Sequence, residues 1–354
     1  MKEKALWLNQ IKGLCICLVV FYHSVITFYP QLHAFQHPWS PTLAKCWVYF
    51  NLYLAPFRMP VFFFISGFLI QRYIDGVSWR DSLGKRVGTV LWVLALWGVL
   101  QWQALSHITQ WLAPDRDVST SANAAYADSF PAFVQAMLTA STSLWYLYAL
   151  IAYFVLCKLT SRGKTLMLGG FALLSVAINF LPTPWWGMNS VLRNIIYYAL
   201  GAWCGTPLMA WMKTFDIRRR WLPLSLFALL AVALWFARTP LFLSLLSIFA
   251  IMKVFYAVAR RFPPSERSVL NVIGSNTIAI YTTHRILVEI FSLLLLGWFS
   301  AQARSPALEL AILLCYPFFS LLLCVATGML ARAFSRRVAG DILFSPPKLA
   351  STRA

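Results

Sequence analysis

The stretch Leu222-Pro-Leu-Ser-Leu-Phe-Ala-Leu-Leu-Ala-Val-Ala-Leu-Trp-Phe-Ala237 contains no charged residue, and a second run, Leu287–Phe299, contains a single one. Across all 354 residues, 60% are hydrophobic and 12% are charged, whereas a soluble protein carries about 25% charged residues. One soluble core cannot bury all of these apolar runs, and the mean hydropathy of +0.68 agrees. The sequence therefore predicts an integral membrane protein.

We expect an all-α fold, a polytopic bundle of about ten transmembrane helices with both termini in the cytoplasm. The expected spans lie at about residues 8–30, 45–73, 88–105, 143–158, 165–181, 190–210, 221–238, 240–258, 269–297 and 307–331. Residues 1–335 are expected to form one transmembrane domain, and residues 336–354 are expected to form a cytoplasmic tail. The longest expected outer loop covers about residues 106–142.

The distribution of basic residues supports this orientation. The formal net charge is +19, which in a soluble chain would indicate nucleic-acid binding. Here Lys and Arg gather in the loops that the span map places in the cytoplasm. The segments expected outside hold only four basic residues: Lys45, Arg116, Arg238 and Arg304. The asymmetry follows the positive-inside rule. We therefore predict that the protein lies in a lipid bilayer and does not bind nucleic acid.

The second expected span is interrupted by two prolines. Arg58 lies between them in the sequence Pro56-Phe-Arg-Met-Pro60. Each proline removes a backbone donor, so this span is predicted to be kinked or broken into two half-helices. Irregular backbone inside a membrane is tolerated where it is buried in protein or lines a wet cavity. Arg58 is therefore a candidate for holding an anion or a polar substrate.

Two histidines lie at matching depths in the expected membrane. His23 and His284 each come about 22 Å along helices of the same direction, so we expect them to share a cavity. Ionisable residues within a membrane are costly and tend to be functional. The simpler interpretation of each histidine is a hydrogen bond between neighbouring helices. Glu289, one turn beyond Arg285, is placed to pair with that arginine.

These polar residues leave two classes of function open. In an enzyme, an imidazole takes a proton from a hydroxyl while an arginine stabilises negative charge. In a proton-coupled exporter of a small polar solute, the same groups relay protons. The seven cysteines show no paired spacing, so the sequence predicts neither a disulfide framework nor a metal site.

Several segments resemble the membrane-bound acyltransferase family 3, which transfers acyl groups to hydroxyls of sugars and glycans. The most specific segment is Phe57-Arg-Met-Pro-Val-Phe-Phe-Phe-Ile-Ser-Gly-Phe68. Four others occur in the order typical of the family: Leu8–His23, Leu144–Ala149, Arg193–Gly201 and Ser275–His284. The resemblance covers about residues 5–335. Within the family, the chain is similar to inner-membrane members from enteric bacteria.

The resemblance implies an O-acyltransferase of the bacterial inner membrane, with residues 1–335 as its acyltransferase domain. An acyl group of the acetyl or succinyl class would come from acyl-CoA, a co-substrate rather than a permanently bound cofactor. The acceptor would be a hydroxyl of a sugar or envelope glycan that enters from the outer side. We expect His23 to act as general base and Arg58 to orient the thioester or its oxyanion.

Six further residues are candidates for substrate binding. His284 and Arg193 would supply polar groups, and Trp145 and Trp185 would stack on a sugar ring. Lys85 and Arg86 are candidates for the phosphates of CoA, because Lys and Arg suit phosphate recognition. Taken singly, each of these two residues is better explained as positive-inside charge.

Overall fold

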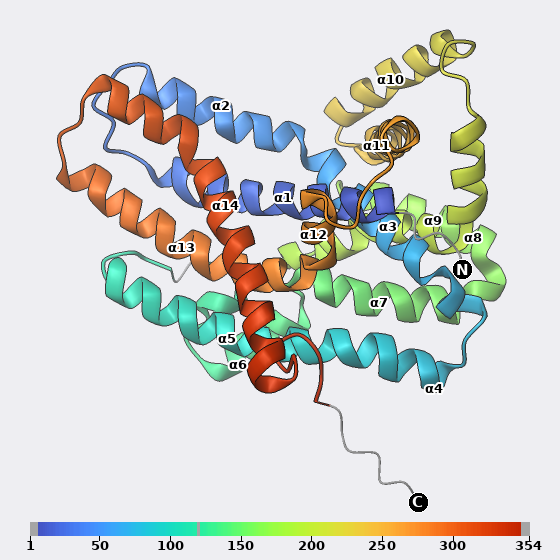
Figure 1. The fold of residues 1–354 in the computed structure, drawn as a ribbon, viewed down its shortest axis with the longest axis horizontal. Coiled ribbons are helices and arrows are strands. Elements are labelled where there is room, and N and C mark those ends of the chain that lie inside the picture. Colours follow the sequence, from blue (N-terminus) through green and yellow to red (C-terminus); the bar gives the residue numbers. More distant parts are fainter. Residues whose placement is uncertain (1–5, 119–120, 348–354) are drawn as a thin grey trace, which may run out of the picture.

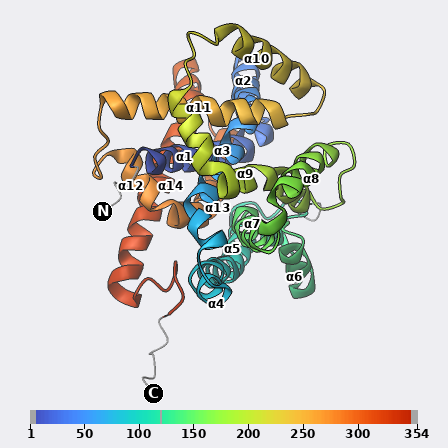
Figure 2. The same cartoon turned by 90° about the vertical axis from the view of Figure 1, so that its right-hand side faces the viewer.

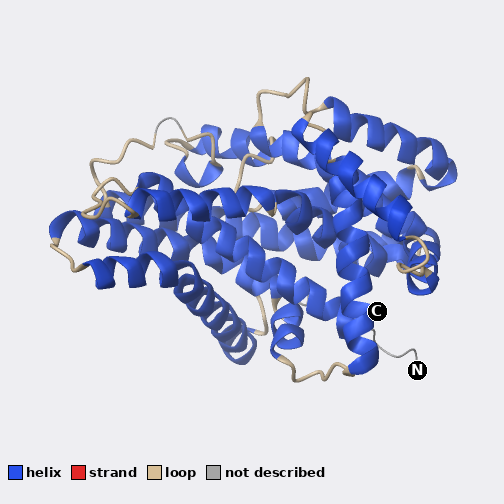
Figure 3. Ribbon diagram, turned by 90° about the horizontal axis from the view of Figure 1, so that it is seen from above, coloured by secondary structure: helices blue, strands red, loops and turns tan. Residues whose placement is uncertain are grey.

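The computed structural model describes residues 6–118 and 121–347, and every regular element within these ranges is a helix (Figure 3). The first half of the chain forms α1 (Leu6–Phe28), α2 (Ser40–Tyr53), α3 (Ala55–Asp75), α4 (Trp79–Ser82), α5 (Thr89–Leu112), α6 (Phe130–Leu138) and α7 (Trp145–Leu159). The second half forms α8 (Lys164–Ala177), α9 (Trp186–Thr214), α10 (Trp221–Phe236), α11 (Leu241–Arg261), α12 (Val269–Ser275), α13 (Thr277–Ala301) and α14 (Pro306–Ala339). Short turns link several of them: η1 (Tyr29–Gln31), η2 (Leu83–Gly88), η3 (Ala124–Tyr126) and η4 (Ser161–Gly163).

Helix α1 is the centre of the bundle. It packs against α3, α12, α13 and α14, and Figure 1 shows it running between α2 and α13. Its apolar side chains, such as Ile11, Ile16 and Val20, are fully buried in the main core. Gly13 lies so close to α12 that a Cβ atom there would come within 2.2 Å of the Leu270 carbonyl oxygen. The polar residues of α1 are therefore held in a closely packed frame.

Helices α3 and α9 form the most extensive helix pair and bring two functional segments together. A Cβ atom at Gly67 would lie 2.1 Å from the Tyr198 carbonyl oxygen, and one at Gly201 would lie 2.1 Å from the Phe64 carbonyl oxygen. Small residues allow helix backbones in membranes to approach this closely. This contact fixes the start of α3 beside the first half of α9.

The predicted break of the second span into two helices is confirmed, but it falls at Leu54, before both prolines, and Arg58 lies in regular helix. Helix α2 ends at Tyr53, and α3 begins at Ala55 with Pro56 in its first turn. A proline is tolerated there because first-turn N–H groups have no partner within the helix. Pro60 lies inside α3, which carries Arg58 between the two prolines.

All ten expected spans coincide with helical segments, but their lengths differ. Among the described residues, six helical segments are long and apolar enough to cross a membrane: 6–31, 40–75, 79–112, 241–261, 277–301 and 306–338. Helices α7 and α10 are apolar but shorter, and α8 has 14 residues. Helix α11 is seen end-on in Figure 1 and lies across the picture in Figure 2, so it crosses the direction of α1. The chain is thus a multi-pass helical membrane protein, while ten spans and cytoplasmic termini stay predictions.

The segment expected to be a tail begins within a helix. Residue 336 lies in α14, which continues to Ala339 and ends at Gly340 with a φ of +58°. Beyond it Phe344 is 3% exposed and stacks on Trp97 at 5.7 Å, and the Trp97 indole N–H donates to the Leu343 carbonyl. Apolar burial and a satisfied indole thus hold residues 340–344 on α5. The rest of the expected tail, residues 348–354, lies outside the described residues.

Candidate active site

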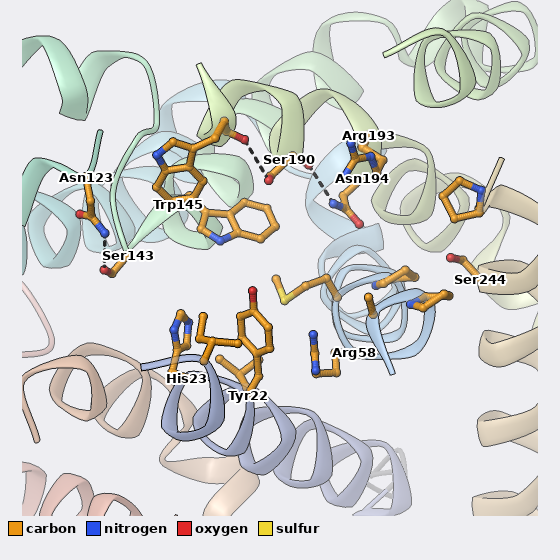
Figure 4. Close-up of a pocket in the computed structure, with 18 of the residues that line it drawn as sticks. Tyr22, His23, Arg58, Asn123, Ser143, Trp145, Ser190, Arg193, Asn194 and Ser244 are labelled. Carbon is orange, nitrogen blue, oxygen red and sulfur yellow. Dashed lines mark hydrogen bonds between the residues drawn. The ribbon is translucent and has the colours of Figure 1, made fainter. Parts of the chain in front are cut away.

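A cavity of about 720 Å³, called here the main cavity, opens between the predicted outer halves of the helices (Figure 4). Residues of α1, α3, α7, α9 and α13 line it, together with the junction of α10 and α11. His23, Arg58, Trp145 and Arg193 are all among the lining residues. Four candidates from distant parts of the sequence therefore share one cavity.

His23 and His284 lie side by side, as their matching depths suggested, but only His23 lines the main cavity, so they do not share it. Their ring centroids are 5.1 Å apart. His23 is half-buried and lines the main cavity, whereas His284 is fully buried behind it. The His284 Nδ1 lies 2.7 Å from the Tyr281 carbonyl oxygen, and its buried Nε2 has no hydrogen-bond partner among the described residues. A substrate in the cavity thus contacts His23, and His284 can act only through its neighbour.

Arg58 reaches the cavity from the start of α3. Its guanidinium lies 4.1 Å from the ring centroid of Tyr22, the residue before His23. It donates to the Asn51 carbonyl at 3.0 Å and to the Asn51 side-chain oxygen at 3.2 Å. The side chain is 6% exposed, and no described carboxylate pairs with it. The cation is held in place by neutral groups and keeps its charge available for a ligand.

The aromatic lining differs from the prediction in one position. Trp145 lines the cavity, but Trp185 does not, and Trp186 takes that place. Trp185 precedes α9 in extended backbone and is 42% exposed. Trp186 is the first residue of α9, and its indole N–H donates to the Ala122 carbonyl at 3.1 Å. The sequence shows only a Trp-Trp pair, and the turn into the helix decides which ring faces inward.

An ion-pair cluster borders the main cavity next to the histidines. Arg285 pairs with Glu289 at 2.9 Å as predicted, and Arg116 from the loop after α5 pairs with the same carboxylate. Arg285 also donates to the Tyr126 hydroxyl at 2.8 Å. Burial raises the pKa of Tyr126 to about 12, so that hydroxyl stays protonated at neutral pH. The cluster ties the expected outer loop to α13, a contact that sequence spacing alone did not indicate.

A second cavity of about 210 Å³ lies toward the other end of the bundle. Lys12, Ser66, Arg86 and Tyr146 are among its lining residues, and Tyr281 lines both cavities. The guanidinium of Arg86 lies 4.2 Å from the Tyr73 ring centroid. Lys85 belongs to η2, and its side chain lies outside the described residues. Arg86 therefore lines the second cavity and not the main one, and the span map places its loop in the cytoplasm.

The chemistry of the main cavity is that of a base beside a cation. A half-buried imidazole and a buried guanidinium face the same space, with hydroxyl, amide and indole groups around them. Within the described residues, no group of three His, Cys, Asp or Glu side chains is placed to hold a metal ion. The arrangement suits proton transfer from a hydroxyl and stabilisation of an oxyanion.

Comparison with known proteins identifies the family of this chain. A family model described as an acyltransferase domain, of the acyltransferase 3 type, matches residues 5–329. The chain is 63% identical over 349 residues to the inner membrane protein YcfT of Escherichia coli strain K12, covering 99% of this chain and 98% of that protein. No solved structure matches the chain. The chain therefore belongs to the acyltransferase 3 family and is a multi-pass acyltransferase of the inner membrane.

Proposed function

We propose that this protein is an O-acyltransferase that moves a short acyl group from acyl-CoA to a hydroxyl of a sugar or envelope glycan. The observation that carries the proposal is the meeting of His23 and Arg58, from α1 and α3, in one cavity of about 720 Å³. That volume lies within the range of small-molecule sites. The family assignment favours this enzyme over the proton-coupled exporter that the polar residues also allowed.

In the proposed reaction, His23 takes the proton from the acceptor hydroxyl. The hydroxyl oxygen bonds to the thioester carbonyl carbon, and Arg58 stabilises the oxyanion that forms. The carbon–sulfur bond then breaks, and the protonated His23 returns its proton to the leaving thiolate. The products are the acyl ester and CoA, and His23 is returned to its starting protonation state.

The donor is proposed to enter through the second cavity. Lys12 and Arg86 line it, and Lys and Arg suit the phosphates of CoA. Tyr281 lines both cavities and therefore lies between them. An acyl group that moves from the second cavity to the main cavity must pass this residue. The tyrosine hydroxyl donates to the Ser143 carbonyl at 2.8 Å, which fixes this side chain between the two cavities.

The catalytic assignment is tested with His23→Ala and Arg58→Ala. Loss of a general base or an oxyanion donor typically costs about 10² to 10⁴ in rate. We expect both variants to lose acylation of envelope glycans, measured by mass spectrometry of cells that express each variant. His107→Ala and Arg162→Ala are matched controls, because both residues are exposed and remote from the cavity. Unchanged acylation by a stably folded His23→Ala protein contradicts the assignment.

The donor is tested separately by titrating purified protein with acetyl-CoA and succinyl-CoA while following its thermal unfolding. A ligand that binds the folded state raises the apparent stability. We expect both thioesters to raise the unfolding temperature and free acetate to leave it unchanged. Absence of any shift with either thioester contradicts acyl-CoA as donor.

A further inference from the structure

The main cavity has a strongly basic lining. Five arginines line it, and none of the acidic residues that the structure describes does: the arginines are Arg58, Arg116, Arg193, Arg238 and Arg285. Arg116 and Arg285 share the single charge of Glu289. The other three arginines form no ion pair among the described residues. Such concentrated positive charge attracts anionic ligands.

Arg193 has an unfilled hydrogen-bonding site. Its Nε is buried and has no partner among the described residues. Figure 4 shows Arg193 and Asn194 on the wall of α9 that faces Tyr22 and Arg58 across the cavity. A buried donor without an acceptor destabilises the protein, and a charged donor does so more strongly. A ligand oxygen is the partner that would remove this cost.

Arg238 occupies a backbone position that usually belongs to glycine. Its φ is +59°, and it follows the end of α10. The Arg238 N–H donates to the Trp235 carbonyl at 3.0 Å, and the Thr239 N–H donates to the Leu234 carbonyl at 2.8 Å. These two bonds form a Schellman motif, in which glycine avoids the steric cost of the left-handed conformation. Here an exposed arginine that lines the main cavity stands at this position.

We propose that the acceptor is an acidic saccharide whose carboxylate or phosphate binds Arg193 and Arg238. The inference rests on the proposed acyl transfer and adds the class of its acceptor. Guanidinium groups bind carboxylates and phosphates through paired N–H donors. Trp186 and Trp235 also line the main cavity and offer ring faces for a sugar.

The position of the arginines assigns the anion to the acceptor rather than to the acyl group. Arg58 packs on the ring of Tyr22, the residue before His23, and so lies near the place where the thioester must react. Arg193 lies across the cavity, and Arg238 is exposed at the junction of α10 and α11. A short dicarboxylic acyl group would place its free carboxylate close to the reacting carbon, nearer to Arg58. An acidic group on a larger acceptor reaches the far wall.

The test compares charged and neutral probes in thermal unfolding of the full-length purified protein. We expect glucuronic acid and glucose 6-phosphate at millimolar concentration to raise the unfolding temperature, and glucose to have no effect. Arg193→Gln and Arg238→Gly should weaken the apparent affinity for both acids about 10- to 100-fold. Arg162→Gln, an exposed arginine away from the cavity, should change nothing.

Arg238→Gly separates binding from folding. Glycine suits a φ of +59°, so this variant should unfold at the same or a higher temperature without ligand. Loss of the acid response in a protein of undiminished stability supports the proposal. No response to either acid, or an equal response to glucose, overturns it.

Succinyl-CoA and butyryl-CoA identify the source of the anion. Both should stabilise the wild type, and both responses should survive Arg193→Gln and Arg238→Gly. If these variants lose the succinyl-CoA response but keep the butyryl-CoA response, the anion belongs to the acyl group and the proposal fails. The measurement requires no turnover, so its failure is distinct from that of the catalytic assignment of His23.

Discussion

His284 is a residue whose role depends on its neighbours. Its Nδ1 lies 2.7 Å from the Tyr281 carbonyl, which can only accept, so Nδ1 carries the proton and Nε2 is an acceptor. That Nε2 is buried without a partner among the described residues, and the ring lies 5.1 Å from that of His23. We infer that His284 positions the imidazole of His23.

We expect His284→Phe to lower kcat by up to about 100-fold while leaving the KM for acyl-CoA unchanged. Phenylalanine keeps a ring in the buried site but removes the acceptor. The check is steady-state acyl transfer by the purified variant, with thermal unfolding measured in parallel. A variant with normal kcat, or one whose KM and stability change together, contradicts a positioning role.

At the level of helices, the contact of α3 with α9 determines the shape of the main cavity. Gly67 and Gly201 each face a carbonyl oxygen of the opposite helix. Because α3 carries Arg58 and α9 carries Arg193, their separation sets the distance between the two walls. Ser66, next to Gly67, adds a 2.8 Å hydrogen bond to Tyr146 of α7.

Gly201→Ala is expected to destabilise the protein by about 3 kcal/mol or more, because its Cβ would meet a backbone oxygen at 2.1 Å. Gly170→Ala in α8 is the matched control, since nothing lies within 4 Å of a Cβ there. Alanine at that control position should be neutral or stabilising. Fluorescence-detected size-exclusion chromatography after heating measures both. Equal stability of the two variants contradicts the close α3–α9 contact.

The orientation of the whole molecule rests on its charge map. The expected outer loop includes Asp128, and the loop between α7 and α8 includes Arg162, which the map places in the cytoplasm. Both residues are exposed. If the map is right, the main cavity faces outward and the second cavity faces the cytoplasm.

Single cysteines test this orientation in a background without the native thiols, of which Cys46 and Cys315 are exposed. We expect a membrane-impermeant maleimide to label Asp128→Cys in intact spheroplasts and Arg162→Cys only after lysis. Labelling of Arg162→Cys in intact spheroplasts would reverse the topology and the proposed entry of the donor.

The amino-acid sequence by itself determined the class of fold and the family, and it singled out His23 and Arg58 as candidates. Long apolar runs require helices in a bilayer, and the two prolines near Arg58 predict the break in the second span, which falls at Leu54. Helical rise alone placed His23 and His284 at one depth, and their rings lie 5.1 Å apart, although only His23 lines the main cavity. These properties follow from local backbone geometry and hydropathy, which a single segment contains.

Only the tertiary structure decided which side chains share the cavity. It placed Trp186 rather than Trp185 in the cavity wall, and it added Arg238 to the same wall. It also paired Arg116 with Glu289. Each of these depends on segments that are far apart in sequence. Helical periodicity states which residues share a face, but it does not state which other helix that face meets. The packing of α1, α3, α9 and α13 supplies that information, and with it the basic wall from which the acidic acceptor is inferred.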